Sequence, residues 1–246
     1  MAGQDLSGFY DSAYARGGER HAAWRELGAR GKADHVLALS ASAGLATGSV
    51  LEIGCGDGAL LAELSSRGFG ESLSGFEISA AALELARARA VPRVASLSEF
   101  DGVSLPVADG AFDLGVLSHV LEHVPEPLPL LREAARACRA LIVEVPLERN
   151  ASGGRAAKRS SSEAIGHVAA LDRAAVRSLV EAAGLRVAHE LLDPLPREVH
   201  TFFASSPAGQ ARGLAKAAVR RGLFRLSPAV AERAVTLHYA CACVPS

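Results

Sequence analysis

The stretch VLEIGCGDG, residues 50–58, limits the possible folds of this chain more than any other part of it. Its first four residues are mostly apolar and β-branched, as in a parallel strand that is buried on both faces. Gly54, Gly56 and Gly58 follow, and they let the backbone turn sharply and approach a ligand closely. Residues 59–67 are predicted to form a helix, whose first N–H groups suit an oxygen-rich ligand. A nucleotide cofactor is therefore expected at the carboxyl end of this strand.

The glycine pattern is compatible with two classes of nucleotide-binding protein. Gly54, Gly56 and Ala59 satisfy the dinucleotide fingerprint, and Glu77 follows about 20 residues later, where a ribose-binding acid would stand. An NAD(P)-dependent oxidoreductase is therefore one candidate. Three further features separate the chain from that class. They are Glu52 two residues before the first glycine, an acid at the end of a predicted third strand, and the segment FDLGVLSH.

Taken in order, these motifs resemble those of class I S-adenosylmethionine-dependent methyltransferases. The matching segments are VLEIGCGDG, Glu77 in SGFEIS, Asp101 before SLPVADGAFD, and FDLGVLSHVLEHVPEP, which together span roughly residues 50–145. The resemblance implies an α/β fold with a doubly wound, seven-stranded, mostly parallel sheet whose last strand is antiparallel beside the sixth. It also implies S-adenosylmethionine as the cofactor and methyl transfer as the reaction. A non-catalytic module that senses the same cofactor is a further alternative.

The resemblance also assigns cofactor contacts by position. Glu77 would accept hydrogen bonds from the ribose hydroxyls, and Asp101 would accept one from the adenine amino group. Each acid has a local alternative, because Glu77 precedes a predicted helix capped by Ser79 and because Asp-Gly pairs are common in turns. The predicted cofactor-binding residues are Tyr14, Glu52, Gly54, Cys55, Gly56, Glu77, Ile78, Asp101, Gly102 and Ser118.

The end of the fourth predicted strand, residues 112–117, should face the acceptor, because ligands bind beyond the carboxyl ends of parallel strands. Methyl transfer requires alignment of nucleophile, carbon and sulfur, and a hydroxyl nucleophile also benefits from a base with a pKa near neutral. His119 follows this strand and is the predicted catalytic residue. The alternative histidines are His123, His167 and His200.

A metal-assisted mechanism is a second interpretation of the same segment. His119, Glu122 and His123 have i, i+3, i+4 spacing, so they share one face of a helix, and with His167 they would bind a divalent metal that polarises a hydroxyl. The pattern resembles the Glu-x-x-Glu-His motif of metal-dependent small-RNA 2′-O-methyltransferases and ubiquinone-pathway O-methyltransferases. His119 replaces the first Glu of that motif, and the Leu-Glu-His-Val sequence is common in metal-free relatives, so no metal is favoured.

The length and the lack of a convincing linker predict a single domain. The resemblance implies that its parts are an N-terminal helical cap (1–45), a cofactor-binding core (46–196), a substrate-side insertion (197–234) and the last strand (235–246). Strands are predicted at 50–53, 72–78, 93–100, 112–117, 141–145, 185–192 and 235–244. Helices are predicted at 13–29 with a break near Gly17-Gly18, and at 32–45, 59–67, 80–90, 130–137, 172–183 and 207–226. Residues 194–206 are predicted to be irregular, and residues 149–162 a loop that is either a solvated connector or a basic lid.

Aromatic residues of the cap, Tyr14 and Trp24, would suit a sulfonium cation. The net charge of −1 gives no overall attraction to nucleic acid or membranes. The absence of a signal-like start, of long apolar runs and of paired cysteines predicts a cytoplasmic protein. We therefore predict O-methylation of a small molecule, anionic if 149–162 is the basic lid, in bacterial secondary metabolism.

Overall fold

A seven-stranded sheet forms the centre of the computed structural model, which describes residues 6–246 except for the side chains of 157, 158 and 161. The first five residues of the predicted cap lie outside the described residues. The strands are β1 (Ser49–Ile53), β2 (Ser72–Glu77), β3 (Val94–Glu99), β4 (Phe112–Ser118), β5 (Cys138–Pro146), β6 (Leu185–Asp193) and β7 (His238–Pro245). They are ordered β3-β2-β1-β4-β5-β7-β6. Strands β1 to β5 pair in parallel, and β7 runs antiparallel to both β5 and β6. The predicted fold is therefore confirmed.

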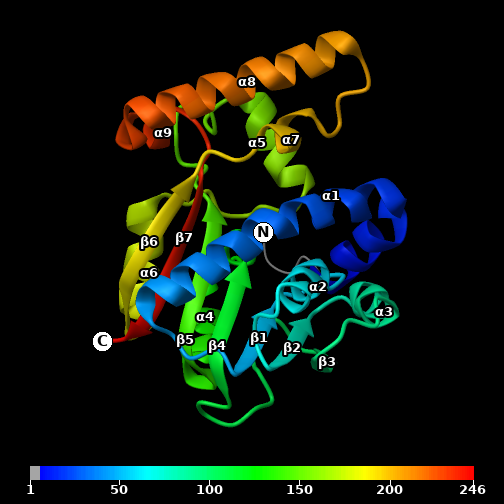
Figure 1. Ribbon diagram of the computed structural model, residues 1–246, viewed down its shortest axis with the longest axis vertical. Coiled ribbons are helices and arrows are strands. Elements are labelled where there is room, and N and C mark those ends of the chain that lie inside the picture. The colour runs from blue at the N-terminus through cyan, green and yellow to red at the C-terminus, as the bar shows by residue number, and fades with distance from the viewer. Residues whose placement is uncertain (1–5) are drawn as a thin grey trace.

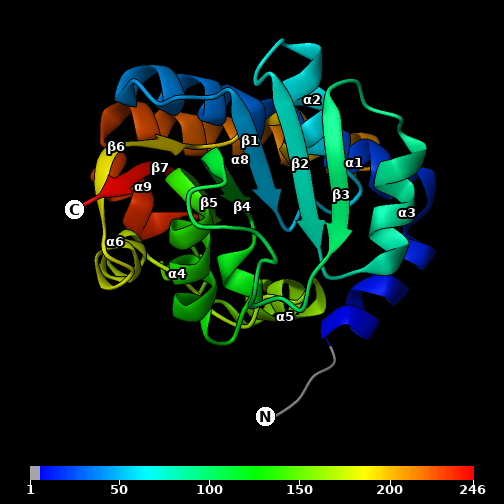
Figure 2. The same ribbon diagram turned by 90° about the horizontal axis from the view of Figure 1, so that it is seen from below.

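Helices cover both faces of the sheet (Figures 1 and 2). The helices are α1 (Leu6–Ala43), α2 (Ala59–Ser66), α3 (Ala80–Ala88), α4 (Pro127–Ala137), α5 (Ala156–Ala164), α6 (Arg173–Ala182), α7 (Arg197–Thr201), α8 (Pro207–Leu226) and α9 (Pro228–Ala234), with a 3₁₀ turn η1 (Leu121–His123). The apolar side chains of α1, α2 and α3 pack on one face, and those of α4 and α6 pack on the other. Strand residues alternate between the two cores, as Val50 and Leu51 do, which is the period-2 arrangement of a sheet buried on both sides.

Helix α1 is longer than predicted. The expected break is confirmed at Gly18, where φ is 58° and ψ is −174°. The expected separation between residues 29 and 32 is wrong, because the helix continues through Gly31. Ala33 and Val36 are fully buried against the sheet, and this packing outweighs the roughly 1 kcal/mol that a glycine costs inside a helix.

Four further segments also differ from the prediction. Residues 156–164 of the expected loop form α5, and residues 197–201 of the expected irregular segment form α7. Helix α4 begins at Pro127 rather than at residue 130, because proline is tolerated in the first helical turn. Helix α9 was not predicted, and Ser227 caps it by accepting the N–H of Val230.

The helices α7, α8 and α9 lie beyond the carboxyl ends of the strands (Figure 1). They come from the predicted substrate-side insertion, residues 197–234, although the division of the chain into four parts stays a prediction. No helix within residues 6–246 is long and apolar enough to cross a membrane.

Candidate active site

The glycine turn after β1 has the strained backbone that its sequence predicts. Gly54 and Gly56 have φ values of 74° and 55°, which residues with a Cβ rarely adopt. The N–H of Gly54 donates to the carbonyl of Phe76 at 2.7 Å, so the turn is tied to β2. A Cβ on Gly56 would collide with the hydroxyl of Tyr14 from α1. The structure therefore places the predicted cap residue Tyr14 directly on the turn.

Glu77 lies at the end of β2 beside this turn. Its Oε2 accepts the N–H of Gly56 at 2.8 Å, and its Oε1 accepts those of Ile78 and Ser79 at 2.9 and 3.0 Å. Burial raises the pKa of Glu77, and these backbone donors oppose the rise. Helix α3 is capped by Ser79, which accepts the N–H of Ala82. The capping role thus belongs to Ser79, and Glu77 is fixed at the tips of β1 and β2.

Glu52 is a buried acid beneath the glycine turn. It is 4% exposed, and it accepts a hydrogen bond from the backbone of Leu61 in the first turn of α2. Its second oxygen, Oε2, is buried without a hydrogen-bond partner among the described residues. Burial raises the pKa of Glu52 to about 8; Lys32 opposes this effect and Glu77 adds to it. Such an orphaned oxygen is a group that a donor on a bound cofactor would satisfy.

The remaining predicted cofactor residues differ in their surroundings. Asp101 is exposed, and its Oδ1 accepts the N–H groups of Val103 and Ser104 at 2.8 and 2.6 Å, as in the predicted turn alternative. These bonds lower the pKa of Asp101. Its role toward adenine, with Gly102 beside it, stays a prediction. Cys55 is buried, and burial raises the pKa of its thiol.

The first part of α1 covers the same region. Ser7 Oγ donates to the carbonyl of Ile78 at 3.0 Å, and Asp11 accepts from Ser79 Oγ at 2.6 Å and from the N–H of Ala81 at 3.1 Å. This segment therefore lies over the carboxyl ends of β1 and β2.

Trp24, the other proposed cap aromatic, does not contact the glycine turn. Its ring lies 5.2 and 5.0 Å from those of Phe202 and Phe203, just after α7. Trp24 thus packs against the predicted insertion, and its suggested position over the sulfonium stays a prediction.

His119 follows β4 with a φ of 60°, an uncommon value for a non-glycine residue. Its Nδ1 lies 3.0 Å from Glu122 Oε1. Its Nε2 lies 3.2 Å from Nδ1 of His238 and 3.7 Å from Oε1 of Glu144. Burial and Lys32 lower the pKa of His119, but the two carboxylates outweigh them and raise it. His119 therefore points toward β5 and β7.

Glu144 is the centre of this group, and the sequence analysis missed it. His238 Nδ1 and His35 Nδ1 each lie 3.2 Å from its Oε1, and Ser118 Oγ donates to its Oε2 at 3.3 Å. Burial alone would raise the pKa of Glu144, but hydrogen bonds from three histidines hold it well below its usual range. The sequence signal for Glu144 was its position as a carboxylate inside the apolar strand LIVEV, because a carboxylate is expensive to bury without partners.

His35 connects this group to a second acid. Its Nε2 lies 3.4 Å from Oδ2 of Asp193, at the end of β6. Burial lowers the pKa of His35, but Asp193 and Glu144 outweigh it and raise the pKa to about 10. The group thus joins α1 to four neighbouring strands.

The four residues of the predicted metal set do not converge on one point. Glu122, His123 and His167 have ligand atoms within 4.8 Å of one another. His167 Nδ1 also lies 2.8 Å from Glu148 Oε2. His119 contacts Glu122 through Nδ1 but directs its Nε2 to Glu144 and His238. The reserve candidate His200 lies in α7, and burial lowers its pKa to about 4.

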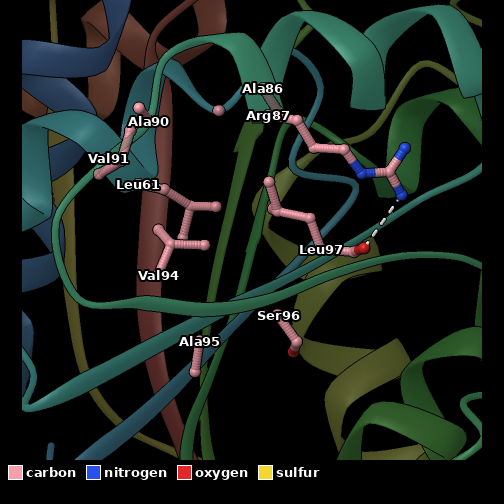
Figure 3. Close-up of a pocket in the computed structure, with 10 residues that line it drawn as sticks. Leu61, Ala86, Arg87, Ala90, Val91, Val94, Ala95, Ser96 and Leu97 are labelled. Atoms are coloured by element: carbon pink, nitrogen blue, oxygen red, sulfur yellow. Dashed lines mark hydrogen bonds between the residues drawn. The ribbon is translucent and has the colours of Figure 1, made fainter.

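One cavity of about 240 Å³ is lined by Gly58 of the glycine turn and by α2, α3 and β3, including Leu61, Ala86 and Leu97 (Figure 3). The other, of about 340 Å³, is lined by Glu148, Arg149 and His167. The second cavity borders the segment predicted as a basic loop.

Comparison with known proteins agrees with the class that the fold and the site define. A family described as a methyltransferase domain matches residues 21–190. The chain therefore belongs to the class I S-adenosylmethionine-dependent methyltransferases, and the predicted family, enzyme class and cofactor are confirmed.

Curated relatives match part of the chain. The ubiquinone biosynthesis O-methyltransferase of Sodalis glossinidius (strain morsitans) is 35% identical over 106 residues, which are 42% of this chain and 41% of the relative. The ubiquinone biosynthesis O-methyltransferase of Pseudomonas aeruginosa (strain LESB58) is 33% identical over 103 residues, which are 41% of this chain and 42% of the relative. The chain thus spans about two fifths of the length of these relatives.

Solved structures support the fold alone, because their sequence identity is low. Geranyl diphosphate C-methyltransferase from Streptomyces coelicolor A3(2), in complex with Mg²⁺, geranyl diphosphate and S-adenosyl-L-homocysteine, has a TM-score of 0.63 at 14% identity. The match covers 87% of this chain and 81% of that one. Haemonchus contortus phosphoethanolamine N-methyltransferase 2 has a TM-score of 0.60 at 14% identity, and the match covers 85% of this chain and 52% of that one.

Proposed function

We propose that this chain transfers a methyl group from S-adenosylmethionine to a hydroxyl of a small molecule. The observation that carries the proposal is that a carboxylate and an imidazole occupy the strand tips on either side of β1. Glu77 ends β2, His119 follows β4, and β1 with its glycine turn lies between them. Cofactor and acceptor would then meet above β1 and β4, where parallel strands end. The names of the curated relatives support oxygen as the acceptor atom.

The residues around the turn fit the cofactor. Backbone N–H groups occupy both acceptor sites of Glu77 Oε1 and one of Oε2, so one site on Oε2 stays open for a ribose hydroxyl, and the buried Oε2 of Glu52 lacks a partner among the described residues. Tyr14 would cover the cofactor from α1, and Asp101 would receive the adenine amino group. When bound, the cofactor supplies an electrophilic methyl group on a sulfonium, whose sulfur leaves as a neutral thioether. The protein must therefore mainly align the nucleophile, and it need not protonate the leaving group.

His119 would act on the acceptor hydroxyl. Glu122 and Glu144 raise the pKa of His119 and so favour its imidazolium form, which donates a proton and does not accept one. As a general base it would work only in the fraction that has lost this proton, so turnover would increase with pH. Glu122 and Glu144 hold the ring at the tip of β4.

We further propose that the acceptor comes from bacterial secondary metabolism and that the protein works in the cytoplasm without nucleic acid. Arg149 lines the cavity beside His167, and it would attract an anionic group on the acceptor. These finer proposals rest on composition and on the position of this basic residue.

The test is calorimetric titration with S-adenosylmethionine and with NAD⁺, followed by a screen of phenolic and carboxylate-bearing acceptors. We expect binding of the first ligand only, and formation of S-adenosylhomocysteine together with a product heavier by one methylene unit. The [4+2]-cyclase SpnF has a similar fold at a TM-score of 0.54, so a product of unchanged mass would refute methyl transfer. Heat with NAD⁺ alone would refute the cofactor assignment.

A further inference from the structure

Three ligand-type atoms form a small triangle at the acceptor side of the sheet. They are Nε2 of His119, Nδ1 of His238 and Oε1 of Glu144. The edges of the triangle are 3.2 Å between the two nitrogens, 3.2 Å from His238 to Glu144, and 3.7 Å from His119 to Glu144. The three residues come from the tip of β4, the start of β7 and the end of β5, and the resemblance to the family assigned no role to two of them.

Hydrogen bonds cannot satisfy all three edges of this triangle. If Nδ1 of His238 carries a proton, that proton has two acceptors at 3.2 Å, Oε1 of Glu144 and the Nε2 lone pair of His119, and these two acceptors face each other across the 3.7 Å edge. If Nδ1 of His238 is instead a lone pair, it accepts from His119 but faces the carboxylate oxygen of Glu144 at 3.2 Å. An imidazole nitrogen is either a donor or an acceptor, so one edge always joins like groups. A cation at the centre would satisfy all three lone pairs together.

The size of the triangle fits such a cation. Zinc binds imidazole nitrogen and carboxylate oxygen at about 2.0–2.2 Å in tetrahedral geometry, which places its ligand atoms about 3.3–3.5 Å apart. The observed edges of 3.2, 3.2 and 3.7 Å scatter around this value. Two histidines and one glutamate also form a known catalytic zinc set, which leaves the fourth position open.

Outer carboxylates support the histidines of this group. Ligand histidines usually direct their second ring nitrogen to a carboxylate, which fixes the tautomer. Nδ1 of His119 lies 3.0 Å from Glu122, on the side of the ring opposite the triangle. Glu144 is in turn contacted by His35, whose other nitrogen lies 3.4 Å from Asp193. The inner layer thus consists of His119, Glu144 and His238, and the outer layer of Glu122, His35 and Asp193.

We propose that His119, Glu144 and His238 bind one divalent transition-metal ion of the zinc class, whose open position takes the acceptor oxygen. The side chains of His119 and His238 are 19% and 18% exposed, whereas that of Glu144 is 1% exposed, so the opening lies on the histidine side. This role for the ion deepens the proposed methyl transfer and depends on it. The site shares His119 with the predicted set of His119, Glu122, His123 and His167, but its other two ligands, Glu144 and His238, come from β5 and β7.

The ion would activate the acceptor directly, because it would lower the pKa of the bound acceptor hydroxyl as metal ions do for bound water. The hydroxyl proton passes to bulk water. The new oxygen–carbon bond forms as the carbon–sulfur bond breaks, and the sulfur pair leaves with the thioether.

Cobalt titration of the full chain, stripped of metal by a chelator, tests the site without acceptor or cofactor. Tetrahedral Co²⁺ has strong visible absorption, and we expect one equivalent to produce it and Zn²⁺ to abolish it. His238→Asn and Glu144→Gln should lose the band. His123→Asn, a matched change in the other group, should keep it.

His238→Cys keeps the test decisive if the carboxylate variant does not fold. A thiolate in place of the imidazole should retain the ion and add a sulfur-to-cobalt charge-transfer band. Calorimetric titration with S-adenosylhomocysteine tests each variant for folding and for an intact cofactor site without using the metal. Failure of the metal site can therefore be told apart from failure of the proposed methyl transfer. No visible band in folded wild-type protein would overturn the metal site. A band lost in His123→Asn but kept in His238→Asn would overturn it as well, because the ion would then lie in the other group.

Discussion

Glu52 allows a quantitative test of the buried charges beneath the glycine turn. The carboxyl is 4% exposed, and one of its oxygens has no hydrogen-bond partner among the described residues. Burial is the largest cause that raises its pKa from 4.5 to about 8, and Glu77 and Asp57 add to this effect, while Lys32 and the backbone of Leu61 oppose it. In the folded protein, Glu52 thus stays protonated at neutral pH.

The sign of the pH dependence follows from this shift. Between pH 4.5 and 8, the unfolded chain has lost the proton of Glu52 and the folded chain has kept it. Folding then takes up a proton, so the contribution of Glu52 to stability is lost as the pH rises through this window. Each pH unit corresponds to about 1.4 kcal/mol, so the loss between pH 5 and pH 7.5 is about 3 kcal/mol.

Urea unfolding of wild-type protein and of Glu52→Gln at these two pH values measures the effect. The amide has nearly the same shape but does not titrate, and other groups cancel in the difference between the two proteins. We expect the free energy of unfolding of the variant, relative to wild type, to gain about 3 kcal/mol from pH 5 to pH 7.5. Glu84→Gln on α3, a largely exposed position, is the matched control and should show no such gain. Parallel pH profiles for Glu52→Gln and wild type would refute the reasoning, because Glu52 would then be ionised in the folded state.

Three other substitutions test the site. Glu77→Gln should weaken S-adenosylmethionine binding by about 1–3 kcal/mol in calorimetry, through lost charge-assisted hydrogen bonds; unchanged affinity would exclude the ribose role. Gly56→Ala should abolish cofactor binding, because its φ is 55° and its Cβ would meet the Tyr14 hydroxyl; full binding restored by adding Tyr14→Phe would show that the hydroxyl alone matters. His119→Ala should leave cofactor affinity near wild type but lower turnover about 10²-fold or more; normal turnover would remove His119 from the chemistry.

The parts of the fold that could be predicted have local signals. Short apolar runs indicate the strands, and single polar residues such as Ser79 and Asp172 indicate helix starts, each accepting a backbone N–H three residues later. Helix α5 has no such signal, because its N-terminus lacks a side-chain cap and Ser162 is instead held by Glu148. Tertiary contacts thus form this helix, and its sequence alone does not.

The candidate site likewise has one part that local sequence signals predict and one part that they do not. Glu77 and the glycine turn are close in sequence and have a recognisable spacing. His35, Glu144 and His238 are separated by about a hundred residues each, and they meet only because β7 pairs with β5 and α1 packs across both. No periodicity links them, so only the buried acid of β5 could have pointed to a polar partner.

The kink at Gly18 divides α1 into two pieces with separate attachments. The longer piece is fixed to the sheet through Ala33 and His35, whereas the shorter piece is attached to β2 and α3 mainly by Ser7 and Asp11. We therefore expect the shorter piece to be able to detach as a unit while the longer one stays on the sheet. The same piece carries Tyr14 over the glycine turn and Tyr10 beside His123, so it would cover both the cofactor and the acceptor. We therefore expect both reactants to bind before turnover, and neither product to leave until this piece of α1 has moved away.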